Sequence, residues 1–308
     1  MGRGARKPQG FRDIDGILLL EKPSGISSNK ALQTARFLFK ANKAGHTGSL
    51  DPLATGMLPV CFGEATKFSA YLLNASKTYR AVCQLGSTTT TADAEGELTS
   101  ECAVRVSIDD IVTVLNQFTG CIDQIPPMHS AVKHKGQRLY HLARKGLVVE
   151  RAARNIEIYS LRMVSFEGSA LEMDVFCSKG TYIRTLVEDI GKTLGCGAYL
   201  ASLRRTGVEP FWQQTCYSID RLRELSKQGL DRLDRCLLPV NSALADLPEL
   251  TVDPAAANLL KQGQAVQVNN APLAGLLSLV HENGQFIGIG EAGSNGRISP
   301  KRLMNTAR

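Results

Sequence analysis

Strand-like and helix-like segments follow one another along this chain without a regular alternation. β-Branched or apolar runs at residues 14–20 and 77–85 are typical of strands, and a helical pattern covers residues 30–40. Residues 156–166 and 171–177 are close enough in sequence to form a strand hairpin. Because parallel α/β folds need repeated strand–helix–strand units, this order favours an α+β fold with a mixed, largely antiparallel sheet over a Rossmann fold.

The composition changes after Pro248, where short strand-like runs separated by Gly and Asn replace the longer elements. This texture predicts a small β-rich second domain, with the boundary in roughly residues 238–250. We therefore place the main domain at residues 14–245 and the second at 246–308. Residues 1–13 are rich in Gly, Arg and Lys, which predicts a disordered basic tail.

Positive charge is concentrated in one stretch of the chain. Lys and Arg number 36 against 29 Asp and Glu, a formal net charge of +7. Residues 128–154, called here the basic segment, hold seven basic residues and only one acidic residue, Glu150. Such clustering is typical of proteins that bind a polyanion, because each neutralised phosphate releases counterions. A solvated basic face is the alternative, and charge alone leaves both open.

The eight cysteines and five histidines do not form metal-site patterns. The cysteines are far apart with no C-x-x-C, and the histidines give no H-x-x-x-H pair. We therefore expect no metal site, and we interpret most cysteines as buried thiols in a reducing cytosol. The chain also lacks an apolar run of the roughly 20 residues that span a bilayer. These features predict a cytoplasmic protein without a membrane segment.

The densest chemical segment is a Gly-rich loop at residues 45–56. Its glycines permit close backbone approach to a ligand, and Pro52 biases Asp51 toward an extended conformation. A carboxylate in this setting could serve as nucleophile or base, although Asp-Pro in such a loop is more often a turn device. A phosphate-binding loop is excluded, because Gly191-Lys192-Thr193 follows Leu186 where that motif needs Gly.

Two further clusters carry candidate residues. Arg184 follows Thr181 at a strand-to-helix junction, where Thr181 could cap the helix and Arg184 could hold a carboxylate ionised. A capped helix with an exposed Arg is the structural alternative. Tyr79 lies between Lys77 and Arg80 on a strand, where a base could stack on it, although a half-buried strand Tyr is the commoner meaning.

Together these motifs resemble the TruB family of tRNA pseudouridine-55 synthases. The matching blocks occur in the family's order at residues 22–25 (KPSG), 46–59 (HTGSLDPLATGMLP), 63–67 (GEATK), 77–80 (KTYR), 126–131 (PPMHSA), 177–184 (CSKGTYIR) and 203–206 (LRRT). The resemblance covers about residues 15–210, and the last sixty residues are similar to the PUA-like domain of bacterial members. It implies the pseudouridine-synthase catalytic fold with a PUA-like RNA-binding domain after it.

The resemblance also assigns roles to residues. Asp51 corresponds to the catalytic aspartate, Arg184 to its partner, and Tyr79 to the tyrosine that meets the target base. The remaining matches are substrate-binding residues. Tyr182 would lie beside the ion pair, Leu203 would form a wall of the uracil pocket, His46 would face the RNA, and Lys22 would support the pocket.

The activity implied is conversion of uridine-55 to pseudouridine in the T-loop of tRNA. A stacked uridine is out of reach, so the nucleotide must be flipped into the protein. Asp51 would then attack C1′, attack C6 or remove a sugar proton, and Tyr79 is the candidate base for the C5 proton. The reaction is redox-neutral and implies no cofactor. An insertion at about residues 125–154 would close over the T-arm, and the PUA-like domain would contact the acceptor end.

Three readings remain open at this point. The first is a stand-alone tRNA pseudouridine synthase. The second is a guide-RNA-dependent relative of the dyskerin type, but the long Lys-rich tail of eukaryotic relatives is absent, and we expect no guide RNA. The third is a non-catalytic RNA-binding or RNA-folding protein, against which the intact Asp51, Tyr79 and Arg184 argue. Without a long exposed heptad pattern, we expect a monomer.

Overall fold

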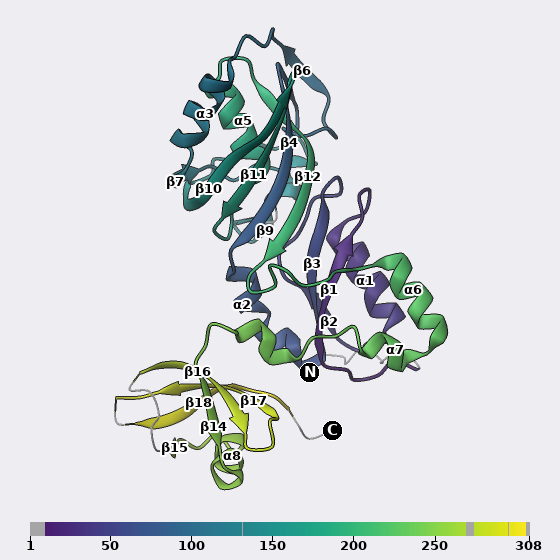
Figure 1. The fold of residues 1–308 in the computed structure, drawn as a ribbon, viewed down its shortest axis with the longest axis vertical. Coiled ribbons are helices and arrows are strands. Elements are labelled where there is room, and N and C mark those ends of the chain that lie inside the picture. The colour runs from purple at the N-terminus through teal and green to yellow at the C-terminus, as the bar shows by residue number, and fades with distance from the viewer. Residues whose placement is uncertain (1–9, 131, 269–273, 295, 306–308) are drawn as a thin grey trace.

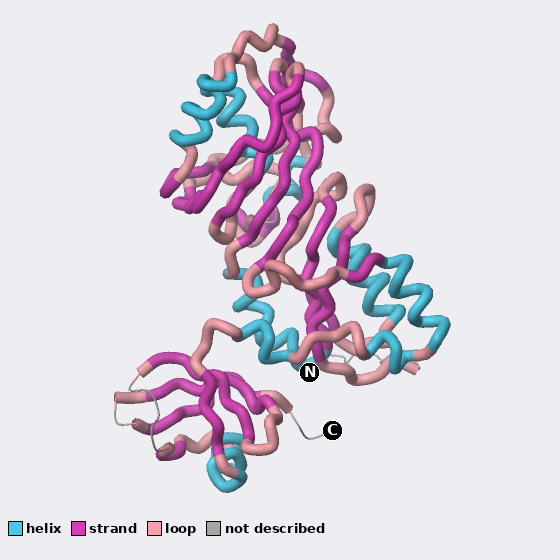
Figure 2. Tube along the Cα trace, in the orientation of Figure 1, coloured by secondary structure: helices cyan, strands magenta, loops and turns pink. Residues whose placement is uncertain are grey.

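The structure, a computed structural model, describes residues 10–130, 132–268, 274–294 and 296–305. Most of its strands form one large mixed sheet, which Figure 2 shows as a long magenta band, and a smaller sheet (Figure 1), and two further pairs of strands form hairpins. The order of the large sheet is β13 (Tyr217–Ser218), β1 (Gly16–Lys22), β3 (Thr55–Phe62), β12 (Ala198–Val208), β4 (Lys77–Leu85), β11 (Ala170–Cys177), β10 (Arg154–Glu167) and β7 (Gly120–Gln124), with β2 (Ala44–His46) paired to β3. Most pairs are antiparallel, which confirms the predicted α+β class.

Strand β12 joins two halves of this sheet. It pairs along most of its length with β4 in antiparallel fashion, but with β3 it forms only two parallel pairs, at Arg204 and Arg205. The loop that ends at β3 and the strand β4 therefore meet at β12. The predicted catalytic residues Asp51 and Tyr79 belong to these two neighbours of β12.

Each half of the sheet has its own helices and core. Helices α3 (Ile108–Gln117) and α5 (Ile183–Thr193) cover the half around β4, β10 and β11. Helices α1 (Ser28–Leu38) and α6 (Ile219–Gln228), with the short α7 (Leu230–Asp234), cover β1 and β3. Helix α3 begins with a capping box between Ser107 and Asp110, in an acidic first turn.

The smaller sheet packs against the large one through a shared apolar cluster. Its order is β14 (Glu249–Val252), β16 (Gly275–His281), β17 (Phe286–Ala292), β18 (Arg297–Leu303) and β15 (Val266–Gln267), and α8 (Pro254–Lys261) packs on it. Phe286 and Ile289 pack beside Phe68, within the stretch formed by the 3-10 helix η1 (Gly63–Phe68) and α2 (Ser69–Asn74). The second 3-10 helix, η2 (Val240–Leu244), joins this cluster, and Lys67 Nζ donates to Leu303 O at 3.0 Å.

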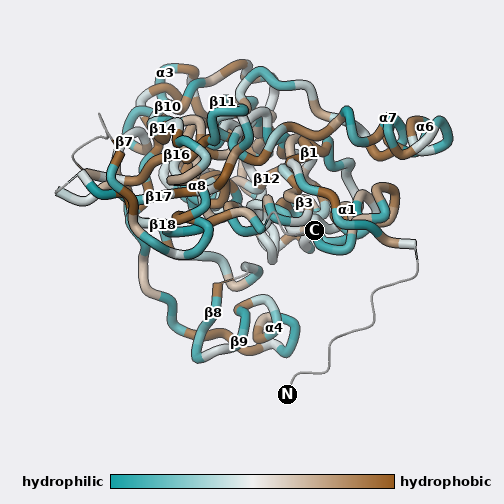
Figure 3. Tube along the Cα trace, turned by 90° about the horizontal axis from the view of Figure 1, so that it is seen from below, coloured by the Kyte–Doolittle hydropathy of each residue, from teal (hydrophilic) through white to brown (hydrophobic). Residues whose placement is uncertain are grey.

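The basic segment stands apart from the body of the protein (Figure 3). It follows β7 and leads into β10, and its described residues form β8 (Lys133–His134), β9 (Gln137–Arg138) and α4 (Leu139–Ala143). Helix α4 begins at Leu139 because β9 takes up the two residues before it. A further hairpin, β5 (Ser87–Thr89) and β6 (Leu98–Glu101), extends from the far end of β4.

The N-terminal tail is described only from residue 10. Arg12, within the stretch expected to be disordered, is already anchored: its Nη1 donates to Asp234 Oδ2 at 2.7 Å and its Nε to Phe39 O at 3.0 Å. Residues 1–9 lie outside the described residues.

Candidate active site

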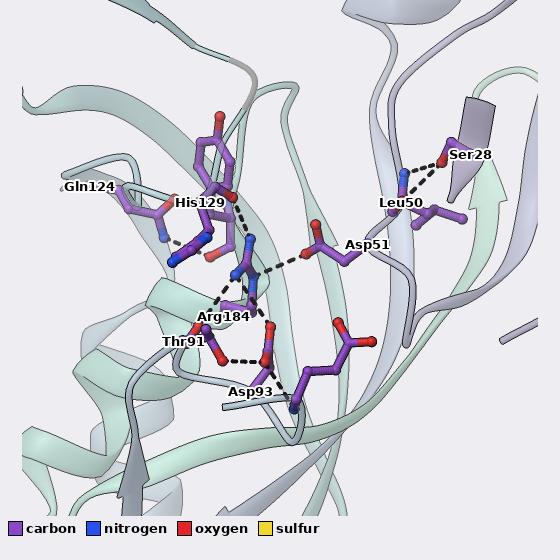
Figure 4. A network of polar contacts seen from close by, with 10 residues as sticks. Ser28, Leu50, Asp51, Thr91, Asp93, Gln124, His129 and Arg184 are labelled. Carbon is purple, nitrogen blue, oxygen red and sulfur yellow. Dashed lines mark hydrogen bonds and ion pairs between the residues drawn. The ribbon is translucent and has the colours of Figure 1, made fainter. Parts of the chain in front are cut away.

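Asp51 lies in the loop between β2 and β3, and buried groups hold the backbone on both sides of it. Before it, the Ser28 hydroxyl donates to Leu50 O at 2.9 Å and accepts from Leu50 N at 2.7 Å (Figure 4). After it, Lys22 Nζ donates to Pro52 O at 3.1 Å. Satisfied buried hydrogen bonds of this kind fix one conformation, so the carboxylate is aimed before any ligand arrives.

Arg184, the second residue of α5, is the centre of the polar network in Figure 4. Its Nε lies 3.0 Å from Asp51 Oδ2, and its Nη1 lies 3.2 Å from Asp93 Oδ2. Its remaining donors reach His129 O at 2.8 Å and Thr91 O at 3.3 Å. The side chain is only 6% exposed, so the alternative of a solvent-exposed Arg is wrong, and its ion pair with Asp51 is present.

Asp93 is a residue of this site that the sequence did not reveal. It lies in the turn between β5 and β6, and its side chain is 3% exposed. Thr91 Oγ1 donates to Asp93 Oδ1 at 2.5 Å, and the Glu95 amide donates to the same oxygen at 3.1 Å. Its partner Arg184 is far along the chain, so sequence spacing carries no signal for the contact.

The start of α5 is fixed by Gln124 rather than by a capping side chain. Gln124 Oε1 accepts from Tyr182 N at 2.7 Å, and its Nε2 donates to Tyr182 O at 3.0 Å. The predicted Thr181 cap is wrong, since its hydroxyl donates to Ser178 O at 3.0 Å and the helix begins at Ile183. Gln124 therefore sets the direction in which Arg184 leaves the helix.

Tyr79 and Leu203 lie on the paired strands β4 and β12, beside the Asp51 loop. Each is 8% exposed, and both belong to one apolar cluster with Leu50. Burial raises the pKa of Tyr79, and the nearby Arg205 guanidinium opposes that rise. The phenol is consequently neutral at pH 7.

The acidity of Asp51 differs from the sequence-based expectation. Pairing with Arg184 predicted a lowered pKa, whereas the pKa of Asp51 is raised because burial disfavours the charged form more than Arg184 favours it. The negative charge of Asp93 raises it further, and Lys22 works in the opposite direction. The side chain is still 40% exposed, so its desolvation is incomplete and one side remains open to a ligand.

Lys22 and His46 complete the predicted set. Lys22 is fully buried, which lowers its pKa to about 8, and it lies under the loop as a support. His46 is the last residue of β2. Its pKa is lowered mainly by burial and, to a smaller extent, by the positive charge of Arg205. Among the described residues, His46 Nδ1 is buried without a hydrogen-bond partner, and no hydrogen bond or ion pair joins His46 to Asp51.

The described residues contain no group of three or more His, Cys, Asp or Glu side chains that could hold a metal ion. In the same part of the chain, no helix is both long and apolar enough to cross a membrane.

Three family models match the chain in succession. Residues 36–183 match the TruB family pseudouridylate synthase N-terminal domain, residues 184–245 the tRNA pseudouridylate synthase B C-terminal domain, and residues 248–304 the C-terminal domain of pseudouridine synthase II TruB.

Comparisons with individual proteins point to the same family as the family models. The chain is 53% identical over 296 residues to the tRNA pseudouridine synthase B of Pseudomonas fluorescens (strain Pf0-1), covering 96% of this chain and 97% of that one. The enzyme of the same name from Ectopseudomonas mendocina (strain ymp) has the same identity and coverage. Among solved structures, a chain of a Cbf5-Nop10-Gar1 complex superposes with a TM-score of 0.71 at 26% identity, covering 94% of this chain and 84% of that one.

Proposed function

Because the chain belongs to the TruB family of pseudouridylate synthases, we propose that it converts uridine-55 of the tRNA T-loop to pseudouridine. The observation that carries the proposal is the Asp51 carboxylate, held 3.0 Å from Arg184 and open to solvent on one side. The apolar wall of Tyr79 and Leu203 stands beside it and suits a flat pyrimidine. A nucleotide flipped out of its stack would bring C1′ and the base to this carboxylate.

The chemistry breaks the N1–C1′ bond, turns the uracil and joins C5 to C1′, after which C5 loses its proton. Asp51 starts it by attacking C1′, attacking C6 or removing a sugar proton, and Arg184 stabilises the carboxylate as its charge changes. Tyr79 supports the ring. Since its phenol is protonated at neutral pH, it takes the C5 proton only while passing its own proton to water.

The T-arm would lie between the Asp51 loop and the basic segment of the main domain. The five cationic side chains Lys133, Lys135, Arg138, Arg144 and Arg151 supply phosphate contacts. Buried polar atoms without a partner among the described residues lie on both sides, at His46 at the end of β2 and at Ser130 in the basic segment. Such atoms are costly unless a ligand satisfies them, and an RNA offers donors and acceptors for each.

The second domain follows the main one as a PUA-like unit that contacts the acceptor end of the tRNA. We further propose a monomer that acts in the cytoplasm on free tRNA, with no guide RNA and no cofactor. Size-exclusion chromatography with light scattering tests the monomer directly.

The test uses tRNA transcript that carries tritium at uracil C5. The purified protein alone should release tritium to water, and the product should map to uridine-55. Asp51→Asn should lower the rate by at least about 10⁴-fold while tRNA affinity stays within about twofold, because the fold is intact and only the reacting group is lost. Asp220→Asn is the matched control, since that side chain is 85% exposed on α6.

Three results would contradict the proposal. Turnover by Asp51→Asn would remove the aspartate from its role. Tight tRNA binding without tritium release by the wild type would indicate a binding-only protein. Release that appears only after a guide RNA is added would indicate a guide-dependent enzyme.

A further inference from the structure

Arg205 occupies the position where the two halves of the active site meet. It is 1% exposed and lies on β12, where its Cα pairs with Gly56 of β3 on one side and with Tyr79 of β4 on the other. Gly56 leads out of the loop that carries Asp51. One buried side chain is thus adjacent in the sheet to both predicted reacting elements.

The guanidinium closes the base of the Asp51 loop. Its Nε donates to Met57 O at 2.7 Å, and its Nη2 donates to Gly48 O at 3.1 Å. These two carbonyls flank the loop before and after Asp51. Gly48 has a φ of +88°, a conformation that glycine adopts without the strain of a side chain, so the carbonyl can turn toward Arg205.

The backbones of Arg205 and Gly56 are closely packed. Gly56 has a φ of +102°, and a Cβ there would lie 2.2 Å from Arg205 O. The strand that leaves the loop is therefore pressed directly against β12. A shift of the Arg205 backbone must therefore move the strand that leaves the loop, and its side chain reaches the loop through the two hydrogen bonds to Met57 O and Gly48 O.

The charge of Arg205 is the second observation. In the part of the chain that the structure describes, no carboxylate forms an ion pair with it, in contrast to Arg184, which has two. Its positive charge acts on neighbouring titratable groups. Burial is the main cause that lowers the pKa of Lys77 to about 8 and the pKa of His46, and the charge of Arg205 is the second cause for both. It also counters the effect of burial on Tyr79, which Cys177 and Asp51 reinforce. A buried cation without an acid is costly and is found preferentially at functional sites.

We propose that Arg205 is a positioning residue that fixes the Asp51 loop relative to Tyr79, so that both face the same flipped nucleoside. The inference rests on the proposed function for its substrate. Misplacement of a reacting group by about 1 Å costs about 10²-fold in rate, so loss of this clamp should appear in kcat while tRNA binding, which depends on other surfaces, is spared.

The experiment compares Arg205→Gln, Arg205→Lys and Arg204→Gln. Arg204, the next residue along β12, is 54% exposed and pairs with Glu21, so it is the matched control. Arg205→Gln should lower kcat by about 10²-fold with KM within about twofold. Arg205→Lys keeps the charge and one donor position, and should recover about tenfold of that loss. Arg204→Gln should match the wild type.

Hydrogen exchange gives a readout that needs no substrate. Amides in the loop between residues 48 and 57 should exchange faster in Arg205→Lys, whereas those of α1 should not change. Wild-type kcat in both Arg205 variants would overturn the proposal, as would a fall in kcat that only follows the folded fraction in thermal unfolding. Inactivity of the wild type and of Arg204→Gln would instead contradict the proposed function. The hydrogen-exchange data would in that case still test whether Arg205 fixes the Asp51 loop.

Discussion

The centre around Arg184 and the basic segment are neighbours that are built in opposite ways. In the centre, Arg184 donates to two carboxylates and two carbonyls and is almost fully buried. In the basic segment, the backbone bonds largely to itself, as from Leu139 N to Val132 O at 2.8 Å. Its apolar side chains are partly in solvent, with Val148 78% exposed.

This difference suits the two regions to different tasks, catalysis at the centre and RNA binding in the basic segment. A reacting group gains rate when its dipoles are fixed in advance, which a buried network provides. A surface that wraps an RNA gains from contacts that form on binding, and its charges work without a single rigid geometry. The two regions meet at His129, whose carbonyl accepts from Arg184 Nη2 at 2.8 Å. Loss of a centre residue should therefore change kcat, and loss of charge in the segment should change affinity.

The sharpest test of this division is Asp93→Asn. Removing its charge leaves Arg184 buried with one carboxylate, and the guanidinium loses the ion pair at Nη1 that helps to hold it while Nε binds Asp51. We expect kcat to fall about 10²-fold with KM nearly unchanged, measured as tritium release at saturating tRNA. Asp174→Asn is the control, because that residue also pairs with an arginine, Arg80, but on a half-exposed surface. A rise in KM without a fall in kcat would contradict the assignment of catalysis to the centre and binding to the basic segment.

The converse test removes charge from the segment. Lys133→Ala, Lys135→Ala and Arg138→Ala combined should weaken tRNA binding by about tenfold at physiological salt and leave kcat at saturation unchanged. The slope of log K against log salt should become shallower by about 0.7–0.9 for each phosphate that the protein no longer neutralises. The matched variant removes Arg221, Arg223 and Lys227 from α6 and should bind as the wild type does. An equal loss of affinity there would place the tRNA elsewhere.

The sequence predicted the elements and the residue types of the site better than their contacts. Strand β4 spans residues 77–85 as its β-branched and aromatic residues predicted, because its pattern is local. The Asp51–Arg184 pair came from resemblance, since no spacing rule connects a loop to a helix so far along the chain. The position of Asp93 depends on tertiary packing, which leaves no local pattern.

Two local predictions failed for identifiable reasons. Thr181 has the side chain of a helix cap, but Gln124 from β7 binds the Tyr182 peptide on both sides and the helix starts later. The lowered pKa of Asp51 followed from its pairing alone, whereas burial and the second carboxylate, Asp93, act against Arg184. Both errors come from neighbours that are distant in sequence.

The smallest expected effect concerns that second carboxylate and the pH profile. A raised pKa means that Asp51 takes up a proton at a higher pH than an ordinary carboxyl, so activity falls as the pH drops through that value. Asp93 contributes to the rise, so Asp93→Asn should lower the pKa of Asp51 and move the acid limb of the single-turnover rate to lower pH. The rates of each protein are normalised to their own plateau. A shift to higher pH would mean that Arg184, once released by Asp93, has moved away from Asp51, and that both carboxylates are needed to hold it.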